Sequence, residues 1–153
     1  MESKHVELKE QDRLILLELR KNCRRSYREL AAEIGMSPAA VIERIKKLEG
    51  RGVIEGYSAR INYLKLGFEF MAVTQIAISG DMLKVQEKMA KLRGVAAVYD
   101  TTGKYDAVAI LICRSRGELS ALVKKLLAIE GVDKTNTNIV LNVVKRLDEF
   151  EGI

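Results

Sequence analysis

A cluster of basic side chains in one short stretch is the part of this sequence with the clearest chemical use. Arg44, Lys46, Lys47 and Arg51 lie close together, shortly after Ser37. Lysine and arginine bind phosphate oxygens, and arginine also binds the edges of bases. The spacing therefore predicts binding to a polyanion, and no catalytic residue is assigned.

A helix has to position this cluster. Ser37 is a good N-cap and Pro38 suits the first helical position. Val41, Ile45 and Leu48 recur at helical spacing and predict a buried stripe. The residues expected to point away from that stripe, or to lie along its flank, are Ala39, Ala40, Glu43, Arg44, Lys46, Lys47 and Arg51.

Two more helices are predicted before it. Apolar residues form a regular stripe over Leu8–Lys21, and Ser26 with Glu29 makes a capping box that begins a second helix, "YRELAAEI". Gly35 follows where a helix usually ends. A helix, a tight turn with glycine and a second helix form the unit that places one helix in the DNA major groove.

The predicted DNA-contacting residues come from this unit. They are Ser26, Tyr27, Ser37, Pro38, Ala39, Ala40, Glu43, Arg44, Lys46, Lys47 and Arg51. Two other interpretations stay open, because a basic helix face is often only solvated surface and such a unit can also bind proteins. After Gly52, the alternating pattern "VIEGYSARI" predicts a small wing or strand pair.

The rest of the chain has a different pattern. "FEFMAVTQIAI", "VAAVYDTT", "DAVAILIC" and "NTNIVLNVV" are predicted strands, and "DMLKVQEKMAKLRG" and "ELSALVKKLLAIEG" are predicted helices. In the first of these helices, Leu83, Val85, Met89 and Leu92 are expected to point inward. The order β-α-β-β-α-β is typical of a ferredoxin-like α/β sandwich, so the fold class is α+β. We expect a helical domain over 1–61, a linker over 62–67 and the sandwich over 68–153.

Composition excludes several function classes. The two cysteines, Cys23 and Cys113, are far apart and His5 is the only histidine, so neither a metal site nor histidine-based catalysis is expected. The chain has no apolar run of membrane-spanning length and its start lacks the apolar core of a signal peptide, so we expect a cytoplasmic protein. The net charge of +5 permits a polyanionic partner without requiring one.

The sequence resembles one known family. "LAAEIGMSPAAVIERIKKLEGRGVIEGYSARIN", followed by a βαββαβ domain with "TTGKYDAV" and "TNTNIVL", is similar to the Lrp/AsnC transcriptional regulators over nearly the whole chain. The resemblance implies an N-terminal winged helix-turn-helix and a C-terminal RAM domain that dimerises and binds amino acids. The family's recognition-helix pattern falls on Ser37, Val41, Arg44, Ile45, Leu48 and Glu49.

The same resemblance implies an effector site where dimers meet in a larger ring. Backbone groups near Gly103 and the polar side chains around it fit the carboxylate and ammonium of an amino acid. The predicted effector-binding residues are Thr101, Gly103, Tyr105, Asp106, Thr135, Asn136 and Thr137. An ordinary hairpin turn has the same "TTGKYD" pattern, so both interpretations stay open.

The functional hypothesis is a sequence-specific transcription regulator without a cofactor. Its expected partners are double-stranded DNA, an amino-acid effector and copies of itself, because strands that are apolar on both faces predict a homodimer, with an octamer as the larger alternative. Two alternatives remain. Siroheme decarboxylases resemble the same architecture, and an architectural protein would wrap DNA without reading its sequence.

Overall fold

The computed structural model describes residues 6–150, so His5 lies outside the described residues. The chain forms two compact units, one of residues 6–60 with 145–150 and one of residues 61–144. In the first unit the guanidinium of Arg60 contacts Glu149 at 3.0 Å. Residues 145–150 therefore belong to the helical unit, whereas the sequence-based boundary assigned them to the sandwich. The domain boundaries 1–61, 62–67 and 68–153 stay a prediction.

The helical unit contains the three predicted helices. They are α1 (Glu10–Lys21), α2 (Tyr27–Glu33) and α3 (Pro38–Gly50). Their shared core consists of the buried side chains of Ile15, Leu30, Ala31, Val41, Ile45 and Leu48. The stripe predicted for α3 is confirmed, because all three of its apolar members lie in this core.

The predicted wing is wrong in this structure. Residues 51–63 contain no strand. The backbone N–H groups of Val53 and Ile54 instead donate to the carbonyl oxygen of Leu48, at 2.9 and 3.3 Å, and their side chains pack on the helical core. Because these amides close the end of α3, they are not available to a strand pair. Tyr57 then donates its hydroxyl hydrogen bond to Glu49 at 2.9 Å.

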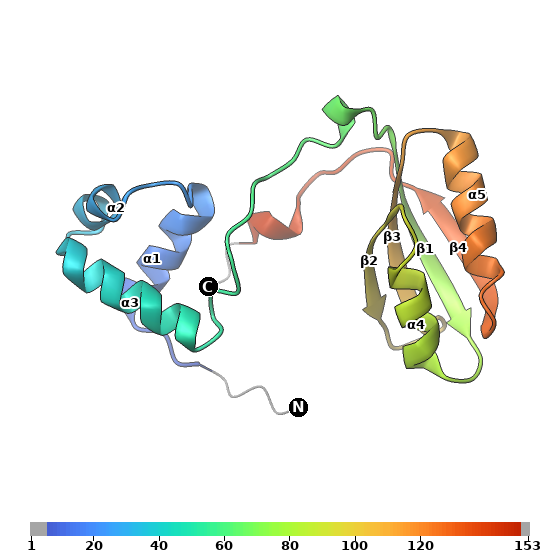
Figure 1. The fold of residues 1–153 in the computed structure, drawn as a ribbon, viewed down its shortest axis with the longest axis horizontal. Coiled ribbons are helices and arrows are strands. Elements are labelled where there is room, and N and C mark those ends of the chain that lie inside the picture. The colour runs from blue at the N-terminus through green and yellow to red at the C-terminus, as the bar shows by residue number, and fades with distance from the viewer. Residues whose placement is uncertain (1–5, 151–153) are drawn as a thin grey trace. The chain divides into compact units, whose positions relative to one another are not determined.

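The second unit is the predicted α/β sandwich. Its elements are β1 (Phe70–Ile78), α4 (Met82–Ala90), β2 (Val95–Asp100), β3 (Ala107–Cys113), α5 (Arg116–Leu127) and β4 (Val132–Ile139). The sheet has the order β2-β3-β1-β4, and each pair of neighbours is antiparallel (Figure 1). Two 3₁₀ turns, Leu64–Leu66 and Leu147–Glu149, complete the described elements. None of the helices within residues 6–150 is both long and apolar enough to span a lipid bilayer.

Both helices of the sandwich cover the same face of the sheet. Val85 and Met89 of α4 join a core that contains alternate residues of β1 and β3 and three leucines of α5. Leu83 was expected to point inward, but its side chain is 71% exposed. The reason is geometric, because Val85 and Met89, four residues apart, fill the inward positions of this nine-residue helix, and Leu83, two residues before Val85, lies on another face.

The last strand begins and ends earlier than the sequence pattern predicts. The prediction placed it over 136–144, whereas β4 pairs with β1 from Val132 to Ile139. The backbone N–H of Val140 makes the last bond, to Met71 at 2.8 Å. This bond lies one residue from the start of β1 at Phe70, and the apolar residues that follow it are exposed, with Leu141 at 96%. Strand length is set here by the neighbouring strand and not by the apolar run.

Candidate nucleic-acid interface and effector turn

The N-terminus of α3 is built as the sequence predicts. The Ser37 hydroxyl accepts a hydrogen bond from the backbone N–H of Ala40 at 3.2 Å, and Pro38 occupies the first turn. Ser37, Pro38 and Ala39 are exposed, and Ala40 is half-buried. Small exposed residues at the start of a helix let its backbone approach a partner closely, as base edges in a groove require.

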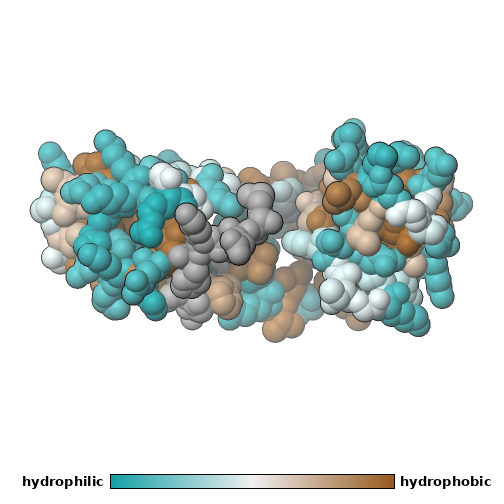
Figure 2. Space-filling view, turned by 90° about the horizontal axis from the view of Figure 1, so that it is seen from below, coloured by the Kyte–Doolittle hydropathy of each residue, from teal (hydrophilic) through white to brown (hydrophobic). Residues whose placement is uncertain are grey.

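The outward face of α3 is charged further along. Lys46 and Arg51 are exposed. Lys47 pairs with Glu43 at 2.6 Å, one helical turn away, and this hydrogen bond from Lys47 lowers the pKa of Glu43. Both side chains are largely exposed, so the pair is weak and Lys47 is available to a phosphate. On the face that Figure 2 shows, the surface of the helical unit is mainly hydrophilic.

Arg44 points from α3 toward α1. Its guanidinium Nη1 lies 2.7 Å from Oδ1 of Asp12, whose other oxygen accepts the backbone N–H of Lys9 at 3.1 Å. Burial by itself raises the pKa of Asp12, but the bonds from Arg44 and Lys9 outweigh it, and the pKa lies below its usual value. Arg44 therefore holds α3 against α1 in the free protein.

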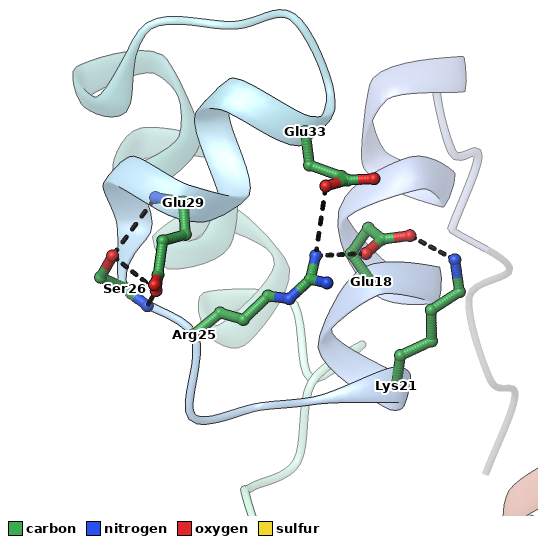
Figure 3. A network of polar contacts seen from close by, with 6 residues as sticks. All are labelled: Glu18, Lys21, Arg25, Ser26, Glu29 and Glu33. Atoms are coloured by element: carbon green, nitrogen blue, oxygen red, sulfur yellow. Dashed lines mark hydrogen bonds and ion pairs between the residues drawn. The ribbon is translucent and has the colours of Figure 1, made fainter.

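A second buried carboxylate fixes the turn between α1 and α2. Glu18 accepts hydrogen bonds from Lys21 and, at 2.6 Å, from Arg25 (Figure 3). Lys21 and, after it, Arg25 lower the pKa of Glu18 below its usual value. Arg25 also reaches Glu33 of α2, at 3.8 Å. The network joins α1, the turn and α2, so the orientation of the helices rests partly on charge pairs.

The capping box at the start of α2 lies beside this network. The Ser26 hydroxyl accepts the N–H of Glu29 at 3.2 Å, and the Glu29 carboxylate accepts the N–H of Ser26 at 2.7 Å (Figure 3). Tyr27 follows as the first residue of α2 and is 46% exposed. The polar groups of Ser26 are thus used in capping α2, whereas the side chain of Tyr27 is accessible to a partner.

The sequence interpretation missed Asp12 and Glu18, which it treated as polar interruptions of an apolar stripe. Both are buried and lie three residues on either side of Ile15, the fully buried residue of α1. That spacing puts all three on one helix face, which is the signal that could have identified them. A carboxylate on a buried face needs a cationic partner, and arginine is the usual one.

Several predicted DNA-contacting residues border one hollow of about 320 Å³ beside α3. The predicted residues at this hollow are Ala40, Glu43, Arg44, Lys47 and Arg51. Lys9 and Asp12, from the segment around the start of α1, also border it. Among the residues around this hollow, four side chains are cationic and two are carboxylates. Ser26, Tyr27, Ser37, Pro38, Ala39 and Lys46 do not border it.

The turn predicted to bind an effector is a tightly bonded hairpin. Thr101 donates its N–H to Asp106 and its hydroxyl to the carbonyl of Tyr105, both at 3.0 Å. The carboxylate of Asp106 accepts the N–H of Ile78 on β1 at 2.8 Å. Gly103 has a φ of +116°, a conformation that L side chains rarely adopt. These bonds fit the structural alternative, and effector binding stays a proposal.

The start of β4 lies at the same end of the sheet. Thr135 and Ala107 both pair with Ile76 from opposite sides, which places them two strand spacings, about 10 Å, apart. Thr137 shares a hydrogen bond of 3.0 Å with the buried Thr74. Asn136 donates to Gln75 at 3.0 Å on the other face. The fold thus brings the 101–106 turn and the start of β4 to the same end of the sheet, and the side chain of Thr137 faces the core.

Comparison with known proteins identifies the family. Residues 8–49 match the AsnC-type helix-turn-helix domain, and residues 71–150 match the Lrp/AsnC ligand binding domain. The chain belongs to the Lrp/AsnC family. An uncharacterized HTH-type transcriptional regulator of Pyrococcus furiosus is 40% identical over 92% of this Lrp/AsnC chain and 95% of its own length.

Two further relatives agree with this assignment. The HTH-type transcriptional regulator LrpA of Pyrococcus horikoshii is 34% identical over 89% of this chain and 98% of its own. The structure of E. coli AsnC matches with a TM-score of 0.84 at 29% identity, over 94% of this chain and 99% of that one. This Lrp/AsnC protein is a transcriptional regulator with a DNA-binding helix-turn-helix.

Proposed function

We propose that this Lrp/AsnC regulator acts in the cytoplasm as a homodimer that reads a specific site in double-stranded DNA and responds to an amino acid. The observation that carries the DNA part is the division of α3 into two sides. Val41, Ile45 and Leu48 are buried, while the side that bears Ala39 and Lys46 is exposed. We assign no catalytic role, and the relatives described above are named as transcriptional regulators.

The dimensions of α3 support this proposal. Its 13 residues span about 20 Å at 1.5 Å per residue, enough to lie in a major groove about 12 Å wide. With Ala39 and Ala40 toward the bases, Lys46, Lys47 and Arg51 lie where phosphates pass. In a two-fold symmetric dimer, the two half-sites would be separated by about one helical turn, roughly 34 Å, or a multiple of it.

Replacing Lys47 by alanine is expected to weaken DNA binding at all sequences alike. Loss of one phosphate contact should lower the slope of log affinity against log salt by about 1. The measurement is fluorescence anisotropy with a genomic fragment selected by the wild-type protein, across a salt series. Lys124→Ala, at an exposed position on α5 of the other unit, is the matched control and should leave the slope unchanged. Equal slopes in both variants would contradict this DNA face.

Self-association is supported by the uncovered face of the sheet. Because α4 and α5 lie together on one face, the side chains of Val73, Val108, Ile110 and Ile112 turn to the other, where they are half-buried in the single chain. The exposed Leu141 adds further apolar surface near the end of β4. Contiguous apolar surface of this kind is characteristic of an interface, and the proposed occupant is a second copy.

Charge placed on the open sheet face should therefore halve the mass in solution. Ile110→Glu would bury a carboxylate without a partner in the proposed interface, which a dimer does not tolerate. Light scattering measures the mass, and Leu83→Glu, at the exposed apolar position on α4, is the matched control that should leave it unchanged. An Ile110→Glu protein with the wild-type mass would rule out this face as the interface.

The effector part of the proposal rests on the end of the sheet where the 101–106 turn and Thr135 lie near each other. An amino acid bound there, where dimers meet, would shift assembly and change DNA affinity by about 5- to 150-fold. The same light-scattering runs, repeated with each of the twenty amino acids and followed by DNA binding, test this. If no amino acid changes either quantity, the 101–106 turn is structural.

A further inference from the structure

A second hollow, of about 330 Å³, lies in the α/β unit at the end of the sheet opposite the 101–106 turn. We name it the basic hollow, and the residues that border it include Phe68, Arg93, Arg114, Glu118, Leu122 and Lys125. It adjoins Cys113, the last residue of β3, while the 101–106 turn adjoins Ala107, the first. Over the length of β3 the two places are about 20 Å apart, so they are separate sites.

The charge of the basic hollow is unbalanced. Three cations, Arg93, Arg114 and Lys125, meet one carboxylate, that of Glu118. This carboxylate is partly used, because it accepts the backbone N–H of Arg114 at 2.8 Å. Within residues 6–150, neither Arg93 nor Lys125 has an ion-pair partner. The basic hollow therefore carries two positive charges in excess.

Arg114 is held in place by an aromatic ring. Its guanidinium carbon lies 4.5 Å from the centroid of Phe68, within the range of a cation–π interaction. A guanidinium stacked in this way keeps its N–H groups at the rim free for an anion, and it loses little conformational entropy on binding. The three cations come from separate segments, before β2, after β3 and on α5, so the fold and not the local sequence brings them together.

The floor of the basic hollow is apolar and closely packed. Leu122 and the buried Cys113 line it. A Cβ at Gly94 would lie 2.9 Å from Cδ2 of Leu122, which shows how tightly α5 lies on this end of the sheet. The charged side chains Arg93, Arg114, Glu118 and Lys125 are exposed around its opening. An apolar floor beneath a few converging charges is the composition of a small-molecule site.

We infer that the basic hollow binds a small organic dianion, one that joins a doubly charged group to a compact apolar body. The excess charge matches a dianion, and the floor accepts the apolar body. The site is independent of the DNA-binding face of α3 and of the proposed effector turn, because no residue is shared between them.

Phenyl phosphate is the probe for this site, titrated into the full chain with backbone amide NMR as the readout. We expect shifts of Gly94, Ile112 and Leu122, and weaker binding of inorganic phosphate, which has no apolar body. Arg93→Glu and Lys125→Glu should each weaken binding by about tenfold or more, because each replaces attraction by repulsion. The matched controls are Lys91→Glu and Lys124→Glu, which reverse neighbouring exposed charges outside the basic hollow and should change affinity by less than about twofold.

Three results would overturn the inference. An equal loss of affinity in all four variants would mean attraction by the general charge of the unit. Shifts confined to residues far from Gly94 would place the probe elsewhere. Displacement of phenyl phosphate by a short DNA duplex would make the basic hollow a contact for the DNA backbone. None of these results bears on DNA binding through α3, which the salt series with Lys47→Ala tests separately.

Discussion

Replacing Arg44 by alanine is expected to destabilise the helical unit by about 2 kcal/mol and to weaken DNA binding as well. The substitution leaves the buried carboxylate of Asp12 without its charged partner, and an unpaired buried charge costs more than an ordinary hydrogen bond. The measurement is hydrogen exchange of the backbone amides in α1 and α3. Lys46→Ala, an exposed charge on the same helix, should change the protection by less than about 0.5 kcal/mol.

A double variant separates the two roles of Arg44. In Asp12→Asn/Arg44→Ala no buried charge is left without a partner, so part of the lost protection should return. If Arg44 acts on DNA by holding α3 against α1, affinity should recover in parallel. If DNA affinity stays low while protection returns, Arg44 contacts DNA directly, as the family pattern implies.

Acid should remove the same interaction. The pKa of Asp12 in the folded protein lies below its usual value of 3.8, so its contribution to stability is present above that pH and is lost as the pH falls through the lower, folded pKa. In Arg44→Ala this loss should be smaller, because the favourable pairing is already absent. An identical loss of α1 protection below about pH 4 in both proteins would contradict the role given to the pair.

Replacing Gly131 by alanine is expected to destabilise the α/β unit by roughly 3 kcal/mol. The residue has a φ of +94°, which an L side chain rarely adopts. A Cβ there would lie 2.8 Å from the carbonyl oxygen of Ser79 and 2.8 Å from Cγ2 of Val85. The carbonyl of Gly131 also accepts the N–H of Ser79, so the backbone cannot move away without breaking the pairing of β1 with β4.

Gly103→Ala is the matched control for this substitution. Its φ of +116° is equally unfavourable, but a Cβ there would meet nothing within 4 Å. Only the backbone strain remains, about 1 kcal/mol. Denaturant unfolding followed by hydrogen exchange in β1 and β4 compares the two variants. If both lose the same stability, the close contacts at Gly131 carry no weight and strain alone explains the loss.

Local sequence determined the helices and the start of the proposed DNA face. Ser26 with Glu29, and Ser37 with Pro38, specify where α2 and α3 begin, because caps act on amides only three residues away. Helical spacing likewise identified the buried stripe of α3. The βαββαβ order could be predicted for the same reason, since each element carries its own period and its own end signals.

The sequence pattern failed where an element depends on a distant neighbour. The wing over 53–61 is absent because Val53 and Ile54 give their amides to the end of α3. The strand β4 stops at Ile139 because β1 begins at Phe70, and the last bond between the two strands runs from Val140 to Met71. In both places the local alternation is real, but hydrogen-bond partners far along the chain decide whether a strand forms.

Tertiary structure alone decided how the charged residues are used. Arg44 and Asp12 are 32 residues apart, and their pairing turns a predicted DNA contact into a brace between α1 and α3 in the free protein. The three cations of the basic hollow come together only when β2, β3 and α5 pack against one another. Charge can be counted in a sequence, whereas the partner of a charge is set by the packing that excludes water around it.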